Sequence, residues 1–167
     1  MANKNTPAKA VALGGVLAAL AVVIMAMGTI IPVAIYVCPV LCAMVLQVVL
    51  KACGKRMAWA WFACVAFLSA LLAPDKEAAA VFAFLGYYPI VKPWMDGRKL
   101  PWLWKGLLFN SATALLYWLL ISILGLSQVG EEFAAMGTAL LVLCLVFGNV
   151  TFFLLDVLLG RKFPGKR

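Results

Sequence analysis

The chain has 167 residues, of which 66% are hydrophobic and only 12% are charged, and its 14 basic and 6 acidic side chains give a net charge of +8. Soluble domains carry about 25% charged residues, so this composition excludes an ordinary water-soluble domain and indicates lipid as the main solvent. The basic residues lie between apolar runs, which favours a membrane protein over a nucleic-acid-binding one. Histidine is absent and most of the five cysteines lie inside apolar runs, so we expect no metal site, no cofactor and no disulfide framework.

The apolar runs predict six transmembrane helices. A helix needs roughly 20 apolar residues to cross the hydrocarbon core. The stretch from Ala10 to Leu50 contains no charged residue and holds two spans, separated where Gly28 and Pro32 interrupt the helix. The first run is too long for a signal peptide and five further runs follow, so we expect it to be retained.

The length of these runs decides between the two structures that can cross a bilayer. Only helices or closed barrels satisfy the backbone in lipid, and the runs are too long and too uniformly apolar for barrel strands. The predicted fold is therefore an all-α integral membrane protein with a single transmembrane domain. It occupies 1–167, with spans at about 10–28, 31–50, 57–73, 77–93, 102–126 and 137–160.

The charges predict which way the spans run. With six spans, both termini and the second and fourth loops share one side, and that side holds every basic residue except Lys76. The other side holds most of the acids. Because positively charged loops stay in the cytoplasm, both termini are predicted to be cytoplasmic. Tryptophans near the same ends of the spans indicate an aromatic belt at that interface: Trp59, Trp61, Trp94, Trp102 and Trp104.

The first span carries small residues at helical spacing, which lets helices approach closely in a membrane. They form three rows: Ala10, Gly14 and Ala18; Ala8 and Ala12; and Gly15 and Ala19. The rows fit packing inside this protein, and they also fit docking against a partner membrane protein.

Spans five and six carry polar groups at membrane depth. Asn110, Thr113 and Tyr117 recur at i, i+3 and i+7 and share one helix face. Asn149 and Asp156 share a face of the last span. Polar groups at this depth face the interior of a bundle, so two interpretations stay open: interhelical hydrogen bonds, or a ligand pocket.

Asp156 lies near the cytoplasmic end of the last span, where we expect it to pair with Lys105 or Lys92. A proton relay needs a chain of titratable groups. With one acid here and no histidine, we expect a structural or coupling ion pair instead.

Span four ends in 86–93, where Pro89 removes a backbone hydrogen bond and predicts a kink beside Tyr88 and Lys92. On the outer side, 74–77 forms a tight turn that either binds a polar solute or is simply solvated. Candidate ligand contacts towards this side are Tyr36, Asp75 and Glu77.

No enzyme signature occurs in the chain, which lacks G-x-S-x-G, H-E-x-x-H and P-loop motifs. We therefore expect a protein that is not an enzyme and that cannot power transport alone.

In its size, six helices, inward termini and small-residue rows, the chain resembles the substrate-binding S components of energy-coupling-factor (ECF) vitamin transporters. The resemblance implies an S-component-like bundle in the bacterial plasma membrane and a small organic solute, such as a vitamin, as ligand. It implies a transmembrane coupling subunit with two cytoplasmic ATPases as partners. It also implies docking through the first helix, by Ala10, Gly14, Gly15, Ala18 and Ala19.

The pocket candidates come from depth and facing, and they are Asn110, Thr113, Tyr117 and Asn149. The first outer loop, 28–32, is short for this family, and the lack of histidine argues against nickel or cobalt. Two other interpretations remain: a membrane assembly subunit without a ligand, and a lipid-handling transporter.

Overall fold

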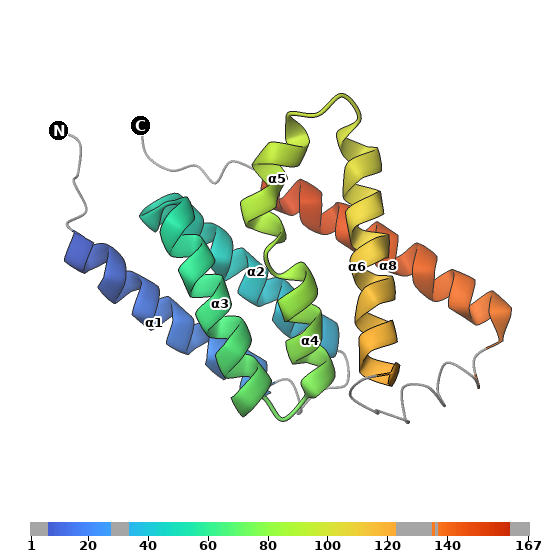
Figure 1. Ribbon diagram of the computed structural model, residues 1–167, viewed down its shortest axis with the longest axis horizontal. Coiled ribbons are helices and arrows are strands. Elements are labelled where there is room, and N and C mark those ends of the chain that lie inside the picture. Colours follow the sequence, from blue (N-terminus) through green and yellow to red (C-terminus); the bar gives the residue numbers. More distant parts are fainter. Residues whose placement is uncertain (1–6, 28–33, 123–134, 136, 161–167) are drawn as a thin grey trace. The chain divides into compact units, whose positions relative to one another are not determined.

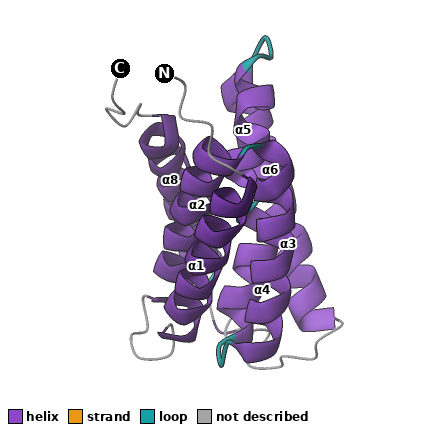
Figure 2. Cartoon of the chain, turned by 90° about the vertical axis from the view of Figure 1, so that its left-hand side faces the viewer, coloured by secondary structure: helices purple, strands orange, loops and turns teal. Residues whose placement is uncertain are grey.

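The computed structural model describes residues 7–27, 34–122, 135 and 137–160. The chain divides into two compact units, 1–97 (unit 1) and 98–167 (unit 2), which are described separately. The described residues form helices and connecting turns, without a strand (Figures 1 and 2). The helices of unit 1 are α1 (Pro7–Ala26), α2 (Ala34–Cys53), α3 (Lys55–Leu72), α4 (Lys76–Leu85) and α5 (Tyr88–Asp96), and those of unit 2 are α6 (Pro101–Ser122) and α8 (Thr138–Gly160).

The core of unit 1 is formed where α1 packs against α2 and α3. The Cys42 thiol donates to the Ala21 carbonyl at 3.4 Å, and the Cys53 thiol donates to the Ala10 carbonyl at 3.5 Å. The later residue of α2, Cys53, contacts the earlier residue of α1, Ala10, and the two helices are therefore antiparallel. Around these contacts lie fully buried apolar side chains, among them Met25, Leu46, Val49, Val65 and Phe82.

The fourth predicted span is two helices rather than one kinked helix. α4 ends at Leu85, and α5 begins at Tyr88 with Pro89 in its first turn. Proline is tolerated there because the first N–H groups of a helix have no intrahelical partner. A Cβ on Gly86 would lie 2.5 Å from the Phe82 carbonyl oxygen, so glycine permits this close turn. The kink expected at Pro89 is therefore a break that begins at Gly86.

The turn between α3 and α4 satisfies the ends of both helices. The Asp75 carboxylate accepts hydrogen bonds from the backbone N–H groups of Glu77 and Ala78, at 2.9 and 3.2 Å, and so caps the start of α4. The Lys76 ammonium donates to carbonyl oxygens at the end of α3, those of Ala70 (2.9 Å), Leu71 (3.4 Å) and Ala73 (3.0 Å). Residues 75 and 76 thus supply hydrogen bonds that neither helix can make within itself.

Three of the described helices are long and apolar enough to cross a membrane: Ala8–Ala26, Lys55–Leu72 and Thr138–Gly160. The described part of the chain is therefore all-α, and it includes three helices that could cross a membrane. Each predicted span overlaps a described helix, and the fourth overlaps both α4 and α5. The parts of the predicted spans at 28, 31–33 and 123–126 lie outside the described residues.

Candidate functional site: the polar seam between α6 and α8

The described part of unit 2 contains two long helices of different character. α6 begins with Pro101 in its first turn. Along its length, Lys105, Asn110 and Thr113 are interspersed among apolar residues. α8 is almost wholly apolar, and only Asn149, Thr151 and Asp156 interrupt its interior. Figure 1 shows the two helices crossing. The polar residues meet at this crossing, and we call the set Lys105, Asn110, Asn149 and Asp156 the polar seam.

The centre of the seam is a reciprocal pair of amides. Asn110 Nδ2 donates to Asn149 Oδ1 at 3.0 Å, and Asn149 Nδ2 donates to Asn110 Oδ1 at 3.1 Å. Each amide nitrogen also donates to its own helix, to the carbonyls of Gly106 (2.8 Å) and Leu145 (2.9 Å). Every amide N–H of the pair therefore donates a hydrogen bond. Of the two interpretations that the sequence allowed, interhelical hydrogen bonds and a ligand pocket, these two residues make the interhelical hydrogen bonds.

An ion pair lies at the other end of the seam. Lys105 Nζ lies 2.8 Å from Asp156 Oδ2, and the two side chains are only 7% and 14% exposed. Of the two lysines expected as partners of Asp156, Lys105 makes the contact. Lys92 instead pairs with Asp96 at 3.5 Å, within α5. A charged pair this well buried must be held together, because either charge alone would be costly at this depth.

Aromatic rings and glycines close the apolar part of the crossing. The Phe109 ring stacks on Phe152 with centroids 4.8 Å apart, and it lies 3.4 Å from where a Cβ on Gly148 would be. Phe153 of α8 approaches Gly106 of α6 in the same manner, at 4.0 Å. A glycine on each helix therefore leaves room for a phenylalanine ring of the other helix. Sequence analysis did not identify this packing, although Gly106 and Gly148 in long apolar runs were a signal for close approach.

Thr113 and Tyr117 continue the face of α6 beyond the amide pair. Among the described residues, Thr113 Oγ1 is buried and has no hydrogen-bond partner. Tyr117 is half-buried. Of the four pocket candidates in unit 2, Thr113 is thus the one whose polar atom is unsatisfied.

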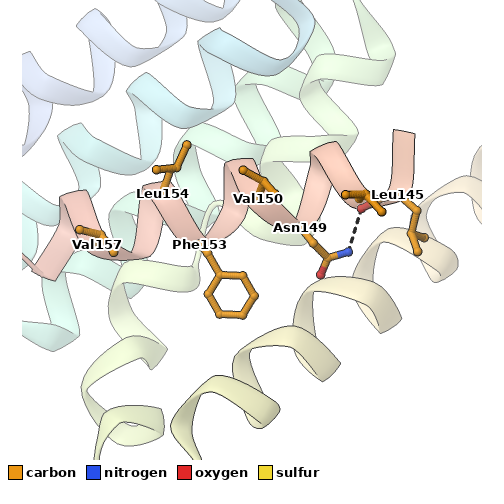
Figure 3. A pocket seen from close by; sticks show the side chains of 7 residues that line it. Leu145, Asn149, Val150, Phe153, Leu154 and Val157 are labelled. Carbon is orange, nitrogen blue, oxygen red and sulfur yellow. Dashed lines mark hydrogen bonds between the residues drawn. The ribbon is translucent and has the colours of Figure 1, made fainter. Parts of the chain in front are cut away.

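A shallow groove runs along α8 beside the seam. It is lined by one face of that helix, Leu145, Val146, Asn149, Val150, Phe153, Leu154 and Val157. In Figure 3, Asn149 and Phe153 project to the same side of α8, and the Asn149 amide turns back to the Leu145 carbonyl. Asn149 is the only polar side chain in this lining, so the groove is suited to apolar groups.

The other candidate contacts belong to unit 1. Asp75 caps α4, and Glu77 follows it in the first turn, where a carboxylate suits the positive helix end. Tyr36 lies in α2, and its side chain is outside the described part of the structure. Tyr88 is fully buried at the start of α5.

The small residues of α1 separate into an inner and an outer face. Gly14 is buried: its carbonyl accepts a hydrogen bond from Trp61 Nε1 at 3.1 Å, and a Cβ there would lie 3.4 Å from Met57 Cε. Ala10 and Ala18, on the same row, are half-buried. This row is therefore internal packing.

Gly15 and Ala19 lie on the outer face of α1. Both are exposed, and no atom lies within 4 Å of a Cβ built on Gly15. Ala8 and Ala12 are also exposed and continue this face towards the N-terminus. We call Ala8, Ala12, Gly15 and Ala19 the outer row. Of the five residues predicted to dock a partner, only Gly15 and Ala19 belong to it.

Comparisons with protein-family models, with curated proteins and with solved structures find no match to this chain.

Proposed function

We propose that this chain is the substrate-capture subunit of an ECF-type importer for a small organic solute such as a vitamin, in a bacterial plasma membrane. The outer row of α1 is the observation that carries the proposal. One side of α1 packs on α2 and α3, and the other presents Ala8, Ala12, Gly15 and Ala19 without any covering side chain at Gly15. In lipid, a smooth face of this kind gains from close contact with another helix, because small residues let the two backbones approach.

The proposed topology has six crossings with both termini in the cytoplasm. Besides the three apolar helices, α2 and α6 have 20 and 22 residues, which at a rise of about 1.5 Å per residue gives roughly 30 Å, the thickness of the hydrocarbon core. α4 and α5 are each half as long and together make one crossing. The basic residues support the orientation, since only Lys76 lies on the proposed outer side.

In this proposal the solute binds from outside and the coupling subunit then engages the outer row of α1. Toppling of the capture subunit in the bilayer, driven by two cytoplasmic ATPases, would carry the solute inward. Within unit 2, the residues proposed to contact the solute are Thr113 and Tyr117. In unit 1, Tyr36, Asp75 and Glu77 stay separate candidates. Asn110 and Asn149 would contribute only by giving up the hydrogen bonds that they make to each other.

A membrane assembly subunit without a solute is the second candidate. The saturated amide pair and the buried Lys105–Asp156 ion pair favour it, because both satisfy polar groups within the chain and leave little for a ligand. The outer row of α1 would then hold a different membrane partner.

Native mass spectrometry of the protein, purified gently from its own host through an affinity tag, tests the proposal. We expect a complex with a transmembrane coupling subunit and two ATPases, or a stoichiometric vitamin-sized adduct. A complex with unrelated membrane proteins and no solute, reproduced in several detergents, would favour the assembly subunit instead.

A further inference from the structure

Cations from three helices meet at one end of unit 1. Lys9 lies in the first turn of α1, Lys51 in the last turn of α2, and Lys55 and Arg56 open α3. All four are exposed, and we call them the basic cluster. Two contacts already described bring these helix ends together: the Cys53 thiol on the Ala10 carbonyl, and the Trp61 indole on the Gly14 carbonyl.

The charge on the first turn of α3 has the unfavourable sign. The start of a helix carries a partial positive charge and favours acidic side chains, yet α3 begins with Lys55 and Arg56 and has no acid in its first turn. The preceding residue, Gly54, has a φ of 86° and provides no side-chain cap. The helix end and its own cations therefore add to the same local positive potential.

The three acids of unit 1 lie on α4 and α5 or just before α4. Asp75 and Glu77 lie at the start of α4, beyond the opposite end of α3. Asp96, the remaining acid of unit 1, lies 3.5 Å from the Lys92 ammonium on α5. α3 and most of α1 are long and apolar enough to cross a membrane, and the cluster lies at their shared end. When these helices are inserted in a bilayer, that end would lie at the level of the lipid headgroups. Trp59, one turn into α3 and 41% exposed, suits that same interfacial position.

We propose that the basic cluster binds the headgroup phosphate of an anionic phospholipid. The phosphate would lie over the first turn of α3 and between the side chains of Lys55, Arg56 and Lys9. The acyl chains would lie against apolar side chains that α1 exposes near this end, such as Val11, Leu13 and Val16. A lipid is favoured over a soluble phosphate because the bilayer holds anionic headgroups at this level whenever the helices are inserted. This site depends on membrane insertion alone and not on a solute or a coupling subunit.

The test is lipid retention by the full-length protein in nanodiscs or mild detergent, measured by native mass spectrometry with equal amounts of phosphatidylglycerol and phosphatidylcholine. The test variant is Lys55→Gln/Arg56→Gln. The matched control is Lys76→Gln/Lys92→Gln, which removes two charges of unit 1 that lie on α4 and α5 and not in the basic cluster. Each cation near the surface contributes a factor of about five to the attraction of an anionic lipid, so the test variant should bind phosphatidylglycerol at least tenfold less well. The control should bind it as the unchanged protein does.

Several results separate this site from its alternatives. Equal losses in the test and control variants, or no loss in either, would overturn the proposal in favour of diffuse charge attraction. Competition by millimolar inorganic phosphate or glycerol phosphate would overturn the lipid as ligand and indicate a small-anion site. Loss of a co-purifying acidic protein, with lipid retention unchanged, would overturn it in favour of a protein partner. If the double variant misfolds, Lys55→Arg and Arg56→Lys keep the charge and should retain binding, whereas Lys55→Glu should abolish binding while placing a favourable acid in the first turn of α3.

Discussion

Asn110 of α6 and Asn149 of α8 exchange two hydrogen bonds, and each also donates to a carbonyl of its own helix. The four donors of the two amides are therefore satisfied without water, which is what a pair inside a membrane requires. This pair fixes the register of the two helices at their crossing. If one amide is removed, the other loses its interhelical hydrogen-bond partner.

The amide pair predicts a specific pattern in a double-mutant cycle. Asn110→Leu or Asn149→Leu alone should destabilise the protein by about 1–3 kcal/mol, because the remaining amide loses its partner. The double variant should cost less than the sum of the two, with a coupling of about 0.6–1.7 kcal/mol. Unfolding in mixed micelles measures these values. Ser111→Ala, which removes an exposed hydroxyl bonded within α6, is the control and should be nearly neutral.

The Lys105–Asp156 ion pair predicts a larger effect. Lys105→Met leaves Asp156 charged and buried without a partner, which should cost about 3–5 kcal/mol. Lys105→Met combined with Asp156→Leu should restore most of that loss, since no charge remains to be compensated. The Lys92–Asp96 pair provides the comparison, because Asp96 is 44% exposed although Lys92 is only 12% exposed: Asp96→Asn should cost about 1 kcal/mol or less. Equal costs for the two pairs would show that the α6–α8 pair is not buried as described.

The break between α4 and α5 predicts that two glycines differ in their tolerance of alanine. Gly86→Ala should destabilise the protein by about 1–3 kcal/mol, because the new Cβ meets the Phe82 carbonyl and ring at 2.5 Å. Gly97→Ala should change stability by less than about 0.5 kcal/mol, since the nearest atom is 3.6 Å away. Thermal unfolding in detergent distinguishes the two, and a tolerated Gly86→Ala would contradict the close turn.

The proposed topology predicts which residues water-soluble thiol reagents reach in intact cells. In a variant without its five cysteines, Pro74→Cys should react from outside, because the α3–α4 turn faces that way in the proposal. Lys99→Cys should react only after the cells are permeabilised. Both positions are exposed, so a difference in labelling would report the side of the membrane and not burial of the residue inside the protein. Labelling of both residues from the same side would rule out the six-span arrangement.

The sequence predicted an all-helical chain, because the long apolar runs leave the backbone no other way to satisfy itself in lipid. It also predicted that Asp156 pairs with Lys105 or Lys92, since a charge at depth needs a counter-charge, but it did not decide between the two lysines. It did not predict that Gly14 faces inward and Gly15 outward, because both are small and lie in an apolar helix without a polar face. It did not predict that the chain breaks at Gly86, because the clash with Phe82 depends on the path of the turn. Helical periodicity placed Asn110 and Asn149 each on a polar face of its own helix. Their mutual pairing could not be predicted, because it depends on the register of two helices that are distant in sequence.

Site-specific photo-crosslinking from α1 in living cells tests the central claim most directly. A crosslinking amino acid would replace Ala19 on the outer row in one variant and Leu13 in a matched control. Leu13 is 40% exposed and lies about 120° round the helix from Ala19. If the chain is a substrate-capture subunit, position 19 should crosslink to a transmembrane coupling subunit, and position 13 should give little or none of this product. The Ala19→Trp variant should lose solute uptake while remaining folded, and Leu13→Trp should keep it. Crosslinking from position 19 to lipid alone, or to a membrane protein unconnected with any ATPase, would contradict the proposed function.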